Sequence, residues 1–345
     1  MSGVQTLTVG PEEGEQRLDR WLRRRFPQLG QGLIEKMCRK GELRLDGGRV
    51  KASDRVQPGQ RVRVPPLPET SAPPPETPAR LPDSDAEMIR AAVLWKDAHI
   101  IALNKPPGLP SQGGSGLGHR HVDGLTPALT FGYKERPVLV HRLDKDTSGV
   151  LLLARTERVA RRLAAAFRAR ETRKIYWAVV AGVPDPRMGT IRYGLVKAGG
   201  RGDERMRCIL PDAVATTEGA KRATTDYAVI EAMGRRAAWM ALVPVTGRTH
   251  QLRAHMAELG HPIIGDGKYG RSGQENLGDG WGRDLGGEIS RKLHLHARMI
   301  RFTHPVTGES VTLTAPLPEH MARSFAAFDW RPEAVAPDPF EEEAG

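Results

Sequence analysis

The stretch VLVHRLDKDTSGVLLLA, residues 138–154, decides how the chain is interpreted. Its two apolar runs, VLV and VLLLA, have the β-branched and aliphatic content of buried strands, and the polar turn between them ends in Ser-Gly. If residues 142–144 are extended, Arg142 and Asp144 point to one face and Leu143 points to the other. Because a neighbouring cation favours the ionised form of a carboxyl group, this arrangement predicts that Asp144 is a nucleophile or an electrostatic stabiliser. The alternative is that Asp144 only forms or caps the turn.

Length and charge narrow the class of protein. A chain of 345 residues exceeds one typical domain, so we expect two folded units and a linker. The formal net charge of +11 predicts a polyanionic partner such as a nucleic acid. Cys38 and Cys208 are too few for a disulfide framework and lack the neighbours that a zinc site needs. The first residues have no signal-peptide pattern, and no stretch approaches the roughly 18 apolar residues of a membrane span. We therefore expect a cytoplasmic protein with no membrane contact.

A small basic module is expected over residues 15–65, after a disordered or loosely ordered N-terminus at residues 1–14. Residues 17–26 repeat apolar groups at helical spacing, and a second helix is expected over residues 33–40, with Gly41 as its stop. Short strands follow, broken by Asp-Gly-Gly and Pro-Gly turns. The module holds 14 Lys and Arg against 6 Asp and Glu, so most of the net positive charge of the chain lies in it.

Two short helices followed by GELRLDGGRVKASDRVQPGQRVRVP, residues 41–65, resemble the αL RNA-binding module first described in a small-subunit ribosomal protein. Cationic side chains of such a module would contact RNA phosphates, which gives salt-dependent affinity without sequence choice. The side chains that we expect to do this are Arg17, Arg20, Arg24, Lys36, Arg39 and Lys40. The alternative is a small basic domain that contacts another protein.

A Pro-rich linker is expected over residues 66–87, because Pro, Ser, Thr and acidic residues there leave too few large apolar groups for folding. The large domain is expected over residues 88–330. Residues 331–345 are expected to form an acidic, disordered tail. Residues 271–292 have the composition of a polar surface insertion.

Several elements of the large domain are predicted from its apolar pattern. A helix is expected over residues 157–170 and a strand over residues 174–180, with Tyr176 on the face opposite Ile175. Two strands over residues 224–246 form a hairpin. Residues 183–222 have only a weak pattern.

A later helix carries positive charge where a helix disfavours it. Thr249 is its expected N-cap and Gly260 its expected C-terminal stop. Three cationic or titratable residues stand at its entry and first turn: Arg248, His250 and Arg253. Because the helix dipole repels cations at this end, the pattern predicts a nearby anion, either an RNA phosphate or the Asp144 carboxylate. A chance arrangement of surface arginines is the alternative.

These motifs together resemble those of bacterial pseudouridine synthases of the RluA family. The matching segments are HRLDKDTSG at 141–149, KIY at 174–176, PVTGRTHQLRAHMAELGHPIIGD at 244–266 and LHA at 295–297. The likeness covers about residues 88–320, and the GGSG loop at 113–116 is most similar to the C-type large-subunit ribosomal RNA enzymes. The resemblance implies an α+β fold: a mixed, mainly antiparallel sheet with flanking helices and a central cleft, plus the small N-terminal module.

The resemblance also implies a reaction, the isomerisation of specific uridines to pseudouridine in RNA, with large-subunit (23S) ribosomal RNA as the expected substrate. Asp144 would be the nucleophile or base toward the ribose, Tyr176 would stack on the base, and Arg253 would pair with Asp144. Arg142 would fill the space left by the extruded base. Further substrate contacts are expected from Leu295, Arg248 and His250. Since the histidines match no metal-binding spacing, we expect no metal and no cofactor, and we expect a monomer.

Two other functions fit parts of the sequence. Asp144-Lys145-Asp146-Thr147 superficially resembles the DxDxT motif of haloacid-dehalogenase phosphatases, but His-Arg precedes it instead of an apolar strand end. A non-catalytic RNA-binding factor in ribosome assembly, acting through the basic module alone, is the second alternative.

Overall fold

The computed structural model describes residues 3–67, 81–113, 118–199, 204–270, 289–336 and 338–340. The chain divides into two compact units, Met1–Arg80 and Leu81–Gly345, and each is described by itself. Most of the expected linker, most of the GGSG loop and most of the 271–292 insertion lie outside the described residues. In the described part of the chain, no helix is long and apolar enough to cross a membrane.

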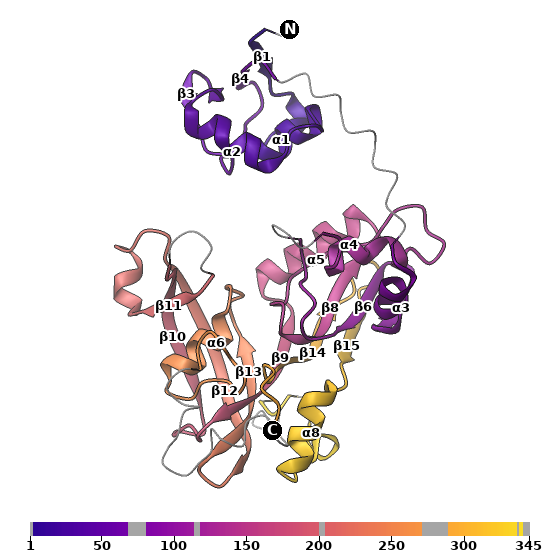
Figure 1. The fold of residues 1–345 in the computed structure, drawn as a ribbon, viewed down its shortest axis with the longest axis vertical. Coiled ribbons are helices and arrows are strands. Elements are labelled where there is room, and N and C mark those ends of the chain that lie inside the picture. Colours follow the sequence, from indigo (N-terminus) through magenta and orange to yellow (C-terminus); the bar gives the residue numbers. More distant parts are fainter. Residues whose placement is uncertain are drawn as a thin grey trace. The chain divides into compact units, whose positions relative to one another are not determined.

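The first unit packs two helices against a small antiparallel sheet (Figure 1). The expected helices are confirmed as α1 (Leu18–Arg25) and α2 (Gln31–Lys40), and Gly41 ends α2 with a left-handed φ of 71°. Leu18, Trp21 and Ile34 are fully buried in the core between helices and sheet. The strands are, in sheet order, β1 (Gln5–Thr8), β4 (Arg61–Val64), β2 (Arg44–Leu45) and β3 (Gly48–Arg49).

Within residues 1–14, which were expected to be disordered or loosely ordered, residues 5–8 form a strand and residues 11–13 a short 3₁₀ helix. Strand β1 pairs with β4, and Val9, just after it, is buried. Glu13 accepts hydrogen bonds from Trp21 Nε1 (3.1 Å) and Arg25 Nη2 (2.7 Å) of α1. Strand β1 shows little apolar alternation because it is an almost fully exposed edge strand, so its order comes from backbone pairing that local sequence does not reveal.

The second unit is built on one large sheet of mixed direction. Its strand order is β11-β10-β12-β13-β9-β14-β8-β6-β5, with β15 paired to β14 and β7 paired to β8. All of these pairs are antiparallel except β8 with β14, which confirms the expected mixed, mainly antiparallel sheet. The strands are β5 (Val93–Lys96), β6 (Ile100–Lys105), β7 (Val138–Leu139), β8 (Ser148–Ala154), β9 (Arg173–Ala181), β10 (Met188–Lys197), β11 (Met206–Ile209), β12 (Lys221–Met233), β13 (Ala237–Pro244), β14 (Leu295–Thr303) and β15 (Ser310–Thr314).

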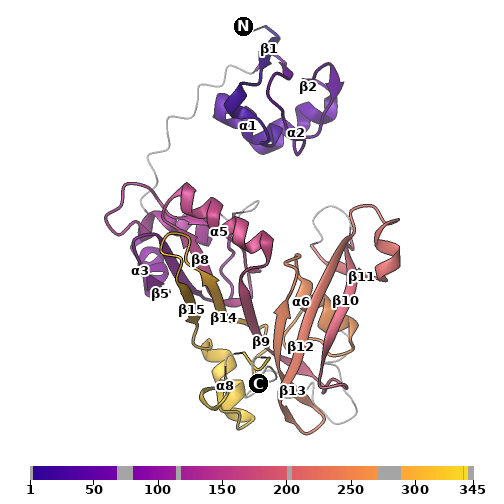
Figure 2. The ribbon, with the colours of Figure 1, turned by 180° about the vertical axis from the view of Figure 1, so that it is seen from behind.

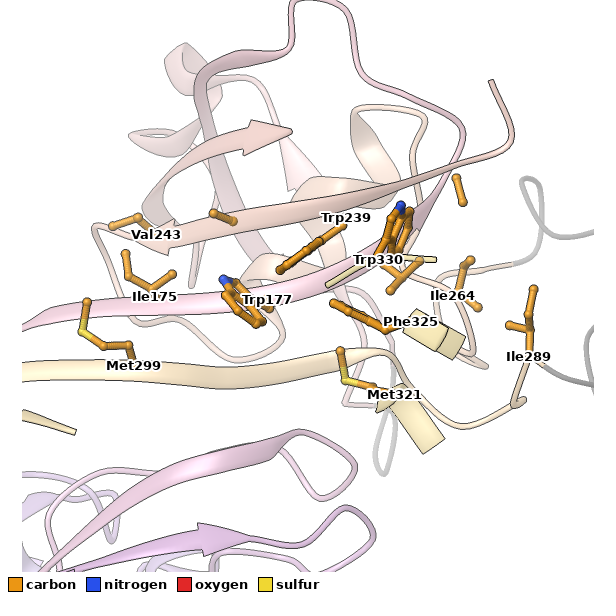
Figure 3. Packing of buried hydrophobic residues seen from close by; sticks show 13 residues of the cluster. Ile175, Trp177, Trp239, Val243, Ile264, Ile289, Met299, Met321, Phe325 and Trp330 are labelled. Atoms are coloured by element: carbon orange, nitrogen blue, oxygen red, sulfur yellow. The ribbon is translucent and has the colours of Figure 1, made fainter. Parts of the chain in front are cut away.

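Helices cover both faces of this sheet at β9 and β13. On one face, α6 (Gln251–Glu258) packs Leu252 and Met256 against alternate residues of these strands. On the other face, α8 (Glu319–Ala327) packs Phe325 against Trp177 and Trp239, as Figure 3 shows. The strands read as almost continuous apolar runs because each face has its own cover.

The same double cover explains the uniformly apolar run VLLLA in β8. One face of β6 and β8 meets α5 (Glu157–Ala169), and the other meets α3 (Asp83–Ala91) and α4 (Val122–Leu125). Figure 2, which views the molecule from behind, shows α5 over β8 and places α6 beside β10–β13, at a different part of the sheet. All seven residues of β8 are buried as a result.

The ordered part of this unit is longer than the sequence predicted. Helix α3 begins at Asp83, inside the range expected to be linker, and buries Ile89 in the core. Asp338, inside the range expected to be a disordered tail, is buried and accepts hydrogen bonds from Arg173 Nε (2.7 Å) and Nη2 (3.0 Å). Phe340 packs against the tryptophan-rich core. The Arg173–Asp338 ion pair and the packing of Phe340 thus hold a segment whose composition alone favours disorder.

Candidate active site

The turn that carries Asp144 is fixed by its backbone. It joins β7 to β8, which pair antiparallel. The carbonyl of the buried Leu143 accepts a hydrogen bond from Ser111 Oγ (2.6 Å), and its N–H donates to the same oxygen (3.0 Å). On the other side of Asp144, the carbonyl of Lys145 accepts from the Lys105 ammonium (3.0 Å). The aspartate therefore stands between two anchored residues, which limits the motion of its side chain.

Lys105 is a buried cation that the sequence analysis missed. Its Nζ also donates to the carbonyls of Pro106 (3.0 Å) and Leu109 (2.8 Å). Burial lowers its pKa to about 7, an effect that the charges of Asp146 and Asp144 oppose. A lysine at the end of the apolar strand IIALNK was the available signal, since buried lysines need partners.

His141 supports the same turn and is unsuited to acid–base chemistry. Its Nε2 accepts a hydrogen bond from the Leu152 backbone N–H (3.0 Å), and its ring stacks on Phe167 at 4.8 Å between centroids. Burial, assisted by the nearby charge of Lys174, lowers the pKa of His141 to about 3. The imidazole is therefore neutral at physiological pH and acts as a brace between the turn, β8 and α5.

Gly149 in the Thr-Ser-Gly sequence is required by the parallel pairing of β8 and β14. Its φ is 106°, which side-chain-bearing residues rarely adopt, and a Cβ there would collide with the Ala297 carbonyl. The close approach of the two strands brings the start of β8 beside Leu295 and His296.

A cavity of about 760 Å³ opens beside Asp144. Six of the seven residues expected to act on the substrate line this cavity: Asp144, Tyr176, Arg142, Leu295, Arg248 and His250. The seventh, Arg253, is buried and contacts Asp144 without lining the cavity. Residues from β8's preceding turn, from β9, from β14 and from the entry to α6 thus meet around one space.

Arg253 supplies the guanidinium beside Asp144. Its Nη1 lies 3.6 Å from Asp144 Oδ2. The same guanidinium donates from Nε and Nη2 to the two carboxylate oxygens of the buried Asp266, each at 2.7 Å. Burial opposes the charge of Arg253, but the hydrogen bonds and charge of Asp266 outweigh it, so the pKa of Arg253 is raised. Asp266 thus fixes a permanent cation that faces Asp144.

Residues 142–144 would bring the Arg142 guanidinium beside Asp144 if they formed a strand, and the structure does not place it there. Residues 142–144 form no strand, and in the described part of the chain Arg142 makes no ion pair with Asp144. Arg142 is exposed and lines the cavity. The backbone around Asp144 bonds to the Ser111 hydroxyl and the Lys105 ammonium and not to a neighbouring strand.

His250 is the second group that faces Asp144, with Nε2 at 3.8 Å from Oδ2. Tyr269 Oη lies 3.1 Å from His250 Nδ1 and accepts a hydrogen bond from the Met206 N–H (2.8 Å). Burial raises the pKa of Tyr269 to about 12, and burial lowers the pKa of His250 despite the charge of Asp144. A neutral phenol and a neutral imidazole therefore share a hydrogen bond between Tyr269 Oη and His250 Nδ1, while Nε2 of the same ring faces Asp144.

Thr249 is not the N-cap of this helix. The cap position of α6 is His250, which adopts a left-handed conformation with φ of 51° and makes no side-chain cap. Instead, Gln251 Oε1 accepts from the Arg248 N–H (3.1 Å) and from Thr246 Oγ1 (2.6 Å). This side-chain network holds the loop before α6, and the His250 ring bonds to Tyr269 Oη. Strain at a buried, partnered histidine is typical of functional sites.

Tyr176 extends from β9 with its side chain partly buried on the cavity wall, on the face opposite Ile175 as expected. Burial and the negative charge of Asp144 raise the pKa of Tyr176, so the phenol stays protonated. Leu295 of β14 is buried and also lines the wall. Together they give the cavity an aromatic and an aliphatic surface, which suits a planar base.

Comparison with known proteins identifies both units. Residues 16–62 match the S4 domain, and residues 99–258 match the family described as RNA pseudouridylate synthase. "Ribosomal large subunit pseudouridine synthase C" of Escherichia coli (strain K12) is 34% identical over 333 residues, which are 93% of this chain and 95% of the relative. The chain belongs to the RNA pseudouridylate synthase family. A Vibrio cholerae protein with the same name is 32% identical over 328 residues, 93% of this chain and 96% of the relative.

A solved structure agrees with this assignment. "Human RNA Pseudouridylate Synthase Domain Containing 4" superposes with a TM-score of 0.57 and 29% identity, covering 71% of this chain and 95% of that one. The synthase is thus an RNA-modifying isomerase with an RNA-binding S4 domain, and the haloacid-dehalogenase alternative is wrong. In the described residues, no group of three or more His, Cys, Asp and Glu side chains could hold a metal ion.

The six cations expected to bind RNA in the S4 domain are all exposed: Arg17, Arg20, Arg24, Lys36, Arg39 and Lys40. Arg17 pairs with Asp19 (2.6 Å) and Lys40 with Glu42 (3.6 Å). In the described part of the chain the other four make no ion pair, so their charges are available to a polyanion.

Proposed function

We propose that this synthase isomerises specific uridines of large-subunit ribosomal RNA, acting as a monomer in the cytoplasm, with Asp144 as the group that attacks or deprotonates the ribose. The observation that supports the proposal is the Asp144 carboxylate at a cavity wall, faced by Arg253 and by Nε2 of His250. The name of the bacterial relatives, ribosomal large subunit pseudouridine synthase C, supports ribosomal RNA as the substrate.

The reaction exchanges one glycosidic bond for another. The N1–C1′ bond of uridine breaks, the uracil turns within the cavity, and C5 bonds to C1′; C5 loses its proton and N1 gains one. Tyr176 would offer its ring face to the turning base, and Leu295 would exclude water beside it. The base must leave its stack to reach Asp144, at a cost of about a few kcal/mol in duplex RNA. Arg142 would occupy the vacated space, and the exposed Arg248 would contact phosphate.

Loss of the C5 proton supplies the test. Large-subunit ribosomal RNA transcribed with uridine tritiated at C5 should release tritium to water when incubated with the wild-type protein, with or without a chelator. Release that requires an added metal ion would contradict the proposed chemistry. If no tritium is released from free RNA or from assembly intermediates, the result would support the alternative function, RNA binding without catalysis.

The S4 domain should supply much of the salt-dependent affinity. Reversing two unpaired charges, Arg20→Glu with Arg24→Glu, should weaken RNA binding and reduce the slope of log affinity against log salt by about 1 for each lost phosphate contact. The control reverses two exposed arginines of the catalytic unit that do not line the cavity, Arg187→Glu with Arg235→Glu. Equal salt slopes for the two double variants would contradict a dedicated role for the S4 domain.

A further inference from the structure

Lys174 lies in the cavity wall, and the proposed reaction assigns no role to its charge. It lies on β9 two residues before Tyr176, so both side chains are on the same face of the strand, and both line the cavity. Its Nζ lies 4.3 Å from the centroid of the Phe167 ring. Within the described residues, no carboxylate or carbonyl accepts a hydrogen bond from this ammonium.

Three other buried or partly buried cations of this unit are satisfied by the protein. Lys105 donates to three carbonyls, Arg253 binds Asp266, and Arg173 binds Asp338. Lys174 has only an aromatic ring, and burial lowers its pKa to about 8 with no acidic group opposing the shift. A partly desolvated ammonium with unused donors is favourable to an anion that completes it, and this one borders the space that the substrate would enter.

We propose that Lys174 forms a subsite for one phosphate of the RNA backbone, next to the nucleotide whose base lies on Tyr176. This inference rests on the proposed function and names one contact within it. Residues i and i+2 of a strand are roughly 7 Å apart, comparable with the separation between a base and the phosphate of its own or the adjoining nucleotide. Lysine binds phosphate as a point charge, so it needs no bidentate geometry. Phe167 holds the ammonium from one side through a cation–π contact and leaves its donors to the anion.

The wall around Lys174 has the charge that such a backbone requires. Arg168, Arg170 and Arg173 also line the cavity, where they outnumber the one neighbouring carboxylate, Glu171. Arg173 is already paired with Asp338, and cations such as Arg168 and Arg170 are favoured at the end of α5 by the helix dipole alone. Lys174 is the one of these whose position is costly without a ligand, and it therefore carries the inference.

The test removes the charge from either partner. A short large-subunit ribosomal RNA fragment that the wild type binds is synthesised as a set, each member with one backbone phosphate replaced by a neutral methylphosphonate. Affinity is measured by fluorescence anisotropy for the wild type, for Lys174→Gln and for Lys174→Arg. Lys197→Gln, which removes an exposed lysine outside the cavity, is the matched control.

We expect one neutral phosphate to weaken wild-type binding by about tenfold, as loss of a charge-assisted hydrogen bond does. Lys174→Gln should weaken binding of native RNA by a similar factor. The affinity of this variant should not change further when the phosphate at that position is neutralised. Lys174→Arg and Lys197→Gln should keep the wild-type preference. That phosphate should adjoin the uridine in which pseudouridine is mapped.

If Lys174→Gln retains the full preference of the wild type for the charged phosphate at every position, the subsite is wrong. A uniform loss of affinity for all fragments, with a lower melting temperature, would identify Lys174 as a structural brace for Phe167 and would also overturn the inference. Isomerisation is scored separately by tritium release. If the wild type binds these fragments without releasing tritium, the proposed function fails, while the pattern of phosphate discrimination still decides the role of Lys174.

Discussion

Replacing Asp144 with Asn is expected to reduce pseudouridine formation by on the order of 10⁴-fold or more, as removal of an essential nucleophile or base does. RNA affinity should be almost unchanged. The amide keeps the size of the side chain but loses the negative charge and the nucleophilic oxygen. The fold should survive because the turn is held by backbone bonds of Leu143 and Lys145, in which the Asp144 side chain has no part.

Tritium release under single-turnover conditions measures the chemistry, and anisotropy with the same RNA measures binding. Asp146→Asn is the matched control, because Asp146 is an exposed carboxylate of the same turn that does not line the cavity. Its rate should stay near that of the wild type. An Asp144→Asn protein that retained a tenth of the wild-type rate would show that another group performs the reaction.

The central strands could be predicted from the sequence because the sheet is covered on both faces. The almost continuous apolar runs at β8, β9 and β13 follow directly from that cover. Asp144 could be predicted as a site residue for a related reason, because a charged turn between two buried strands often indicates a functional site. Strand β10 was missed: it lies toward the sheet's edge between β11 and β12, and its burial is too irregular to give a clear period of two.

What the sequence could not reveal depends on partners that are distant in the chain. The positive first turn of α6 predicted a nearby anion, and the Asp144 carboxylate does face it, but the stronger partner of Arg253 is Asp266. Asp266 follows the apolar run Pro-Ile-Ile and Gly265, and nothing local distinguishes it from a turn aspartate. The left-handed His250 is equally dependent on Tyr269 and Gln251, which are set by contacts that only the folded chain brings together.

Replacing Asp266 with Asn is expected to lower both stability and activity. The amide nitrogen would face the donors of Arg253 in place of a carboxylate oxygen, and a buried guanidinium would lose its counter-ion. Breaking one partner of a buried ion pair lowers the free energy of unfolding by about 3–5 kcal/mol. Because Arg253 would no longer be aimed at Asp144, the single-turnover rate should fall by roughly 100-fold, as small misplacements in active sites do. Urea denaturation and tritium release measure the two effects.

A double variant separates the two effects. Arg253→Met with Asp266→Leu replaces the ion pair by apolar groups of similar volume, which often restores the stability that a broken pair loses. Its free energy of unfolding should exceed that of Asp266→Asn, whereas its activity should stay low because no cation then faces Asp144. If activity recovered together with stability, Arg253 would matter only to the fold. Since Arg253 Nη1 is directed at Asp144 while Nε and Nη2 bind Asp266, we expect the two properties to part: Asp266 holds the guanidinium, and the guanidinium serves the carboxylate that reacts.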